Sequence, residues 1–287
     1  MICIIYIQGV DNIKMIRKYK RGYRRAYSKK KNYKIILTIT LFIISVLFGA
    51  KLKEFANFTT GEPGRITNSY TEDIQSVNDR YNRRQADEFL SSIPEYSGTP
   101  SVVINHNKPT FTSDEYDEAK EKYIKLSKLD YFRRCGTCSM SVGSDTITSA
   151  ERGDISNIYP SGWHQKTYED IIEDSSHTLY NRSHLLAYSM SGLNDEPRNL
   201  ITGTTYMNHR GMLPYETAIL NYIKKNGGRI LYRVTPIFKG RELVARGVYL
   251  EAGDVETLGN KFHVNVYCYN VQPGIGIDYT VGTSYRK

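Results

Sequence analysis

An uninterrupted apolar run near the N-terminus is the strongest hydrophobic feature of the chain. Residues 35–50 (IILTITLFIISVLFGA) carry no charge, and Thr and Ser are their only polar side chains. A helix of this length reaches about 24 Å, slightly less than the ~30 Å hydrocarbon core of a bilayer. A basic stretch precedes the run, and this order is typical of a signal anchor or a cleaved signal peptide. A buried core helix with a basic tail is the remaining interpretation.

Farther along the chain, the apolar pattern changes from a helical period to a period of two. Apolar residues recur at helical spacing in 114–129 and in 214–226, and a Gly-Gly pair ends the second segment. Alternation then predicts three antiparallel strands in a meander, at 230–238, 243–250 and 262–269. We therefore expect an α+β fold with a central antiparallel sheet flanked by helices.

These patterns divide the chain into four parts. We expect a basic cytoplasmic segment at 1–34, the signal segment at 35–50, a polar linker at 51–94 and one catalytic-sized domain at 95–287. A short helix is expected within 71–90. Translation from Met15 instead of Met1 would keep the signal.

Charge is distributed unevenly along the 287 residues. The chain has a formal charge of +9, of which residues 1–34 supply +10 and the rest −1. Since basic residues stay inside, the chain from about residue 51 onward is expected outside the cytoplasm, either membrane-anchored or secreted. The neutral body can bind a polyanion only through a local patch. With 40% hydrophobic and 24% charged residues, the chain is not collagen-like, wholly disordered or a polytopic membrane protein.

One of six histidines has neighbours suited to chemistry. The stretch YNRSHLL places His184 beside a cation, a hydroxyl group and apolar residues. Asn208 follows 24 residues later, and Glu216 follows eight after that. On one helix, a separation of eight turns about 80°, so both side chains could face one site. Gly211 and Pro214 argue against an unbroken helix there.

Several ordered motifs resemble the DNA/RNA non-specific endonucleases of the ββα-metal, or His-Me finger, class. They are SGWH, YNRSHLLAY, NLITGT, MLPYE, YRVTPIF and YNVQPGIGIDY, and they extend over about half the chain, roughly 130–287. The similarity is greatest to exported Gram-positive members, including membrane-tethered nucleases of DNA uptake. The family pattern Asp-Arg-Gly-His is Asn181-Arg182-Ser183-His184 here. The departures remove one negative charge and the flexibility of a glycine.

The resemblance implies a ββα-metal core, a role for each of four residues, and Mg²⁺ as cofactor, with Mn²⁺ as a substitute. His184 would be the general base that activates water, since a neutral imidazole accepts a proton near pH 7. Asn208 would be the direct ligand of one Mg²⁺, and Glu216 would hold the waters around that ion. Arg182 would pair with a phosphate oxygen.

The implied reaction is hydrolysis of DNA, and also of RNA, without sequence preference, leaving 5′-phosphate ends. No base-reading helix or RNA module is recognisable, and contacts to phosphate carry no sequence information. No protein partner can be inferred. Further phosphate or substrate contacts are expected from four residues: Arg198, Arg210, Arg233 and His164.

Structural roles remain open for the same residues. Asn208 could cap a helix, Glu216 could be a solvated helix residue, and Arg182 could form an ion pair. The candidate partners of that ion pair are Asp170, Glu173 and Asp174. His209 and Trp163 are expected to have surface and packing roles, and Asn199 to bond to the backbone.

Three cysteines lie on the exported side, and two of them form a C-x-x-C. Cys135 and Cys138 could form a disulfide with each other, or one of them could pair with Cys268. The two could instead act as a redox dithiol. No second C-x-x-C or spaced His pair completes a zinc site. The alternatives to a nuclease are therefore a surface nucleic-acid-binding protein without catalysis and an envelope thiol–disulfide protein.

Overall fold

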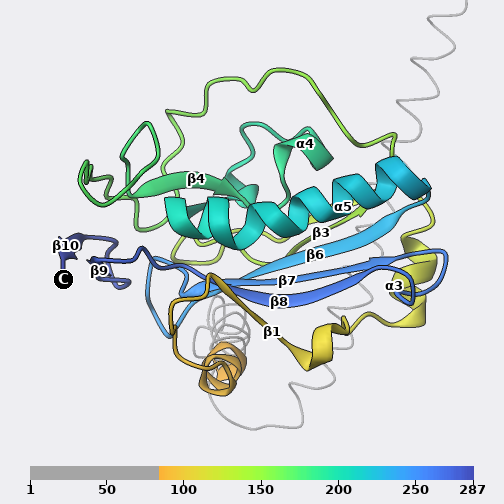
Figure 1. Cartoon of the computed structure of the whole chain (residues 1–287), viewed down its shortest axis with the longest axis horizontal. Coiled ribbons are helices and arrows are strands. Elements are labelled where there is room, and N and C mark those ends of the chain that lie inside the picture. The colour runs from red at the N-terminus through yellow and green to blue at the C-terminus, as the bar shows by residue number, and fades with distance from the viewer. Residues whose placement is uncertain (1–83) are drawn as a thin grey trace, which may run out of the picture. The chain divides into compact units, whose positions relative to one another are not determined.

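A computed structural model describes residues 84–287 of the chain (Figure 1). The expected basic segment, the apolar run at 35–50 and most of the expected linker lie outside the described residues. Within 84–287, no helix is both long enough and apolar enough to cross a membrane.

The centre of the fold is a six-stranded antiparallel sheet with the order β1-β8-β7-β6-β3-β2. Its strands are β1 (Ser101–Val103), β2 (Ile124–Leu126), β3 (Cys138–Val142), β6 (Ile230–Ile237), β7 (Gly247–Asp254) and β8 (His263–Tyr269). The strands β6, β7 and β8 pair consecutively, which confirms the predicted meander. The middle strand lies about four residues farther along the chain than its alternation suggested.

Two small antiparallel ribbons and several short helices complete the fold. The ribbons pair β4 (Tyr180–His184) with β5 (Leu200–Thr204), and β9 (Ile275–Ile277) with β10 (Ser284–Arg286). The α-helices are an N-terminal helix over 84–92, α3 (Ser113–Glu118), α4 (Tyr188–Ser191) and α5 (Leu213–Asn226). The other helical turns are η1 (Asn105–Asn107), η2 (Pro197–Asn199) and the π-helical η3 (Met207–Met212). The predicted helix at 214–226 is confirmed as α5.

Side chains along each central strand point alternately to the two faces of the sheet, and both faces are buried. On β6, Tyr232 and Val234 face the main core, which includes Ile219 and Ile223 of α5. Leu231, the residue before Tyr232, packs in a cluster with Tyr116 of α3 on the opposite side. Figure 1 shows α5 running along one face of the sheet, with the described N-terminal helix on the other side. Coverage of both faces explains why these strands contain so few exposed apolar residues.

The expected helix over 114–129 is confirmed only at its start. Thr112 and Glu115 form a reciprocal capping box that starts α3, but the helix ends at Glu118. The chain then forms β2, in which Ile124 pairs with Met140. The apolar residues after the helix therefore follow a strand period, which overlaps the helical spacing over so short a stretch.

The packed domain begins before residue 95. Residues 84–92 are helical, and Phe89 packs its ring 5.0 Å from that of Tyr249 and 5.9 Å from that of Tyr267. The sequence predicts a polar linker over this stretch because its apolar residues are few. Their spacing nevertheless places them on one side of the helix, against the outer face of the sheet.

A buried carboxylate closes the turn between β7 and β8, and its removal should destabilise the domain. Asp254 accepts hydrogen bonds from the backbone N–H groups of Thr257, Lys261 and Phe262 and from the Thr257 hydroxyl. Burial alone raises the pKa of Asp254, but these hydrogen bonds outweigh it and hold the pKa below its ordinary value. An Asp254→Asn variant should lose roughly 2 kcal/mol of unfolding free energy, measured by urea denaturation at pH 7.

The same carboxylate should make stability depend on pH. Because its pKa is lowered in the folded state, Asp254 stabilises the fold above its unfolded pKa of about 4, and this contribution is lost as the pH falls through the folded value. The stability difference between wild type and Asp254→Asn should therefore shrink below pH 4. A constant difference down to pH 2 would contradict this account.

Candidate active site

A hairpin followed directly by a helix carries the three residues with the strongest sequence signal. His184 is the last residue of β4 and pairs with Leu200 across the ribbon. The chain leaves β5 and is helical without a break from 205 to 226. Asn208 lies in the first turns of this helix and Glu216 in its α-helical part.

A π-helical turn resolves the conflict between Pro214 and a continuous helix. The Leu213 N–H donates to the Asn208 carbonyl, five residues back, so the turn contains an additional residue. Pro214 lies in the first turn of α5, where its missing N–H is tolerated. One inserted residue also changes the angle between Asn208 and Glu216 from about 80° to about 20°, which places both on one face.

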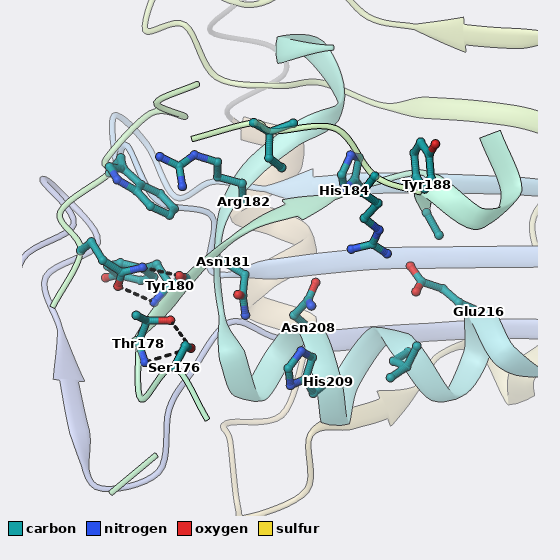
Figure 2. Close-up of a pocket in the computed structure, with 16 residues that line it drawn as sticks. Ser176, Thr178, Tyr180, Asn181, Arg182, His184, Tyr188, Asn208, His209 and Glu216 are labelled. Carbon is teal, nitrogen blue, oxygen red and sulfur yellow. Dashed lines mark hydrogen bonds between the residues drawn. The ribbon is translucent and has the colours of Figure 1, made fainter. Parts of the chain in front are cut away.

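These side chains line a single cavity of about 540 Å³. Figure 2 shows Asn208 and Glu216 on the helix facing the strand that carries His184. The wall also includes Arg152, Trp163, Tyr180, Asn181, Arg182, Tyr188 and His209. The cavity is therefore lined by a base candidate, a carboxylate, two arginines and three side-chain amides.

The His184 ring is held in one orientation and one tautomer. Its Nε2 lies 2.9 Å from the carbonyl oxygen of Asn194. Because a carbonyl can only accept, Nε2 donates, and Nδ1 remains to accept a proton. Burial lowers the pKa of His184, and the charge of Arg152 lowers it further, while the carbonyls of Asn194 and Leu193 act in the opposite direction. The ring is therefore neutral at pH 7.

Glu216 is a carboxylate without a protein partner. Within residues 84–287 its side chain forms no hydrogen bond or ion pair. Burial raises the pKa of Glu216 to about 7, although the positive charge of Arg152 opposes this. The Asn208 amide likewise has no hydrogen-bond partner in the described part of the chain. Two oxygen-bearing groups without partners on one helix face are suited to a hydrated cation.

Arg182 is held by the backbone of a neighbouring segment. Its Nε and Nη2 donate to the carbonyls of Ile158 and Ser156, and its guanidinium lies 4.3 Å from the centre of the Trp163 ring. The expected alternative, an ion pair with a nearby acid, is wrong. Asp170 pairs with Arg286 instead, and Asp174 lies 3.7 Å from His209.

Arg152 is a cavity residue that the sequence did not single out. Its guanidinium carbon lies 5.7 Å from the centre of the Tyr188 ring. It forms no ion pair within residues 84–287, and its charge acts on both His184 and Glu216. No motif or periodic pattern marks this position in the polar stretch around it. A free cation in the same cavity as a neutral base and an unpaired carboxylate is suited to bind an anion.

The four weaker substrate candidates lie outside this cavity. Arg233 pairs with Glu115 and Glu251 on the other face of the sheet, and Arg198 pairs with Glu196. His164 is exposed and does not line the cavity. Arg210 lines an adjacent depression that shares His209 and Leu213 with the cavity. Of the four, only Arg210 borders the candidate site.

A buried amide supports the strand that carries His184. Asn199 accepts a hydrogen bond from the Leu186 N–H at 2.8 Å and donates to the Leu186 carbonyl at 2.9 Å. The expectation that Asn199 bonds to the backbone is confirmed. These two bonds fix the chain directly after β4, so the end of the strand cannot shift independently of β5.

The three cysteines within residues 84–287 form no disulfide. Cys135, Cys138 and Cys268 are all free and buried. Burial raises the pKa of Cys135 and of Cys138 to about 12, and that of Cys268 also rises. A redox dithiol needs an accessible thiolate, so the thiol–disulfide interpretation is wrong. The Cys135 thiol instead donates to the carbonyl of Leu200, the residue paired with His184.

Because no disulfide constrains the domain, a reducing agent should leave its stability unchanged. We expect melting temperatures within about 1 °C of each other with and without dithiothreitol. Differential scanning fluorimetry of the full-length chain measures both values. A clear decrease in the presence of the reductant would show that two of these cysteines pair.

Comparison with known proteins identifies a family profile and a shared fold. Residues 115–255 match the sequence profile of the family described as DNA/RNA non-specific endonuclease. The crystal structure of NucA from Streptococcus agalactiae with magnesium ion bound is 24% identical over 72% of this chain and 95% of that chain, with a TM-score of 0.59. The structure of NucA from the same organism with no metal bound is 22% identical over the same shares, with a TM-score of 0.57. No curated protein sequence matched the chain.

The likeness to NucA shows a shared fold, and the family match covers β4, β5 and the helix that follows them. The chain carries a DNA/RNA non-specific endonuclease domain, the family that its motifs resemble. It is thereby a hydrolytic endonuclease.

Proposed function

We propose that this chain hydrolyses phosphodiester bonds of DNA and RNA outside the cytoplasm, using His184 as general base and a divalent cation, Mg²⁺, at Asn208 and Glu216. The observation that supports this most is the convergence of His184, Asn208 and Glu216 on one cavity, from a hairpin and the helix directly after it. The NucA structure with magnesium ion bound agrees with the choice of ion.

His184 activates the attacking water. Its Nδ1 is unprotonated, and the lowered pKa keeps the ring neutral at pH 7. The bond from Nε2 to the Asn194 carbonyl strengthens as the ring gains a proton, which stabilises the imidazolium that forms. The base therefore needs no carboxylate partner.

Asn208 and Glu216 fit a cation that keeps most of its water. The amide oxygen of Asn208 would be a direct ligand, and the Glu216 carboxylate would hold waters of the hydration shell. When bound, the cation stabilises the negative charge that develops on the phosphate and the leaving 3′-oxygen. With water as nucleophile and a 3′-oxygen leaving, the products carry 5′-phosphate ends.

Arg152 contributes a second positive charge to the site. Its free guanidinium would bind a non-bridging phosphate oxygen, which also stabilises the transition state. Arg182 keeps one unoccupied edge, through Nη1, for a neighbouring phosphate. Because every one of these groups acts on phosphate or water, the proposed site cuts without sequence preference and does not require a 2′-hydroxyl.

An extracytoplasmic location follows from the sequence at the N-terminus. The +10 segment before the apolar run at 35–50 favours an inside N-terminus and an exported domain, either anchored or secreted. Fractionation of cells that express the full-length chain tests this directly.

A plasmid digest tests the reaction. The full-length chain should linearise and degrade plasmid DNA at millimolar Mg²⁺, should cut a structured RNA, and should lose both activities in EDTA. The 5′ ends of the products should accept label from polynucleotide kinase only after phosphatase treatment. An intact plasmid bound by a folded chain would instead favour a binding protein without catalysis.

A further inference from the structure

An exposed tyrosine stands beside the cavity without a role in the proposed chemistry. Tyr159 has 71% of its surface exposed. Its ring centre lies 5.6 Å from the guanidinium carbon of Arg182, which lines the cavity. Most exposed apolar side chains need no explanation, but this one is next to a cation that lines a candidate active site.

The backbone around Tyr159 is fixed from both sides. We call residues 156–163 the rim segment. Arg182 of β4 donates to two of its carbonyls, and the Thr202 hydroxyl of β5 donates to the Ser161 carbonyl at 2.9 Å. The Ser161 hydroxyl donates to the Leu243 carbonyl at 2.7 Å. The hairpin that carries His184 therefore also holds the segment that presents Tyr159.

The way the segment is held also explains Arg182. The Nε–Nη2 edge of its guanidinium is used to hold the rim segment, and the rings of Trp163 and Tyr159 lie 4.3 and 5.6 Å from its carbon atom. Arg182 is thus a positioning residue for an aromatic surface. That surface contains one exposed ring and one partly buried ring next to the cavity.

We infer that Tyr159 is a stacking platform for an unpaired nucleobase next to the scissile phosphate, so that the site binds single-stranded nucleic acid in preference to duplex. This rests on the proposed function. An exposed aromatic ring binds the flat face of any base, which suits an enzyme without sequence preference. In a duplex, each base already stacks on its neighbours and is paired, so an internal base cannot reach Tyr159 unless it is extruded.

The test separates the base from the phosphate. A His184→Ala version of the full-length chain slows cleavage, and fluorescence anisotropy at millimolar Mg²⁺ measures binding of three labelled probes. The probes are oligothymidine, an abasic strand of the same length and a blunt duplex. Adding Tyr159→Ala should weaken binding of oligothymidine by roughly tenfold. It should change binding of the abasic strand and the duplex less than twofold.

Two matched variants make the result specific. Tyr159→Phe keeps the ring and should bind all three probes like the parent. Tyr131→Ala removes another exposed tyrosine, with 82% of its surface exposed and no place in the cavity wall, and should also behave like the parent. The fluorescence of Trp163, the single tryptophan of the chain, should change when oligothymidine binds, which reports that the strand occupies this site.

Equal binding of oligothymidine and the abasic strand by the parent would overturn the inference, as would an unchanged dissociation constant in Tyr159→Ala. An equal loss for all three probes would assign Tyr159 a general structural role and would also overturn it. The plasmid digest by the wild-type chain is independent of these readouts. A chain that binds bases through Tyr159 but never cuts would refute the proposed hydrolysis alone.

Discussion

Replacing His184 by alanine is expected to lower the rate of DNA cleavage by about 10³-fold while the chain stays folded. In the proposed mechanism the neutral ring accepts the proton of the attacking water at Nδ1, and no other imidazole of residues 84–287 lies in a comparable position. His209 is the other histidine that lines the cavity, but it is exposed and lies 3.7 Å from the Asp174 carboxylate. The rate of plasmid linearisation under single-turnover conditions measures the loss.

The matched control for this variant is His164→Ala, which removes an exposed histidine outside the cavity and should keep wild-type activity. Circular dichroism and a melting curve check the fold of both. A His184→Ala variant that retains activity within tenfold of wild type would show that another group removes the proton. In that case the cavity would have to be assigned a different base.

Replacing Glu216 by glutamine is expected to raise the Mg²⁺ concentration for half-maximal cleavage by roughly 10- to 100-fold. The substitution keeps the shape and the hydrogen-bonding capacity of the side chain but removes its charge. Glu216 forms no hydrogen bond or ion pair within residues 84–287. Removing its charge should therefore break no contact within the protein and should weaken only the binding of the cation. Saturating Mg²⁺ should restore most of the rate, which separates a role in holding the ion from a role in the chemical step.

The same residue should make Mg²⁺ binding depend on pH. Because burial raises the pKa of Glu216 to about 7, the carboxyl group is largely neutral below that pH, and the ion must displace a proton to bind. The Mg²⁺ requirement of wild type should therefore rise as pH falls from 8 to 6, and that of Glu216→Gln should stay flat. The control is Glu121→Gln on the exposed surface, which should match wild type at every pH. Identical Mg²⁺ curves for wild type and Glu216→Gln would exclude a role of this carboxylate in holding the ion.

Local patterns predicted the parts of the fold in which neighbours along the chain decide the structure. The alternation in 230–238 and 262–269 gave two central strands, since both faces of the sheet are covered and a period of two fits such strands. The prediction of one helix over 114–129 was wrong after residue 118, because over a few residues the apolar positions fit both the helical period and the strand period. The choice between a helix and β2 was made by pairing with β3, which no local pattern contains.

The candidate site divides in the same way. His184, Asn208 and Glu216 were identified from their types, their order and the resemblance of their motifs. Arg152 was missed because its importance comes only from the folded chain, which brings a polar loop beside His184 and Glu216. The charge of Arg233 was the only reason to expect a phosphate contact there. In the structure Arg233 lies on the opposite face of the sheet and pairs with two carboxylates.

The sequence by itself indicated the family, the candidate residues of the site and the antiparallel meander, because each of these depends on side-chain type and short-range spacing. Tertiary structure decided how those residues meet. The π-helical turn aligns Asn208 with Glu216, and the buried Asn270 ties β5 to the rest of the domain through bonds with Thr202, Thr204 and Ala245. Such alignment depends on contacts between segments that are distant along the chain. The pKa of each group depends on burial, which also exists only in the folded domain.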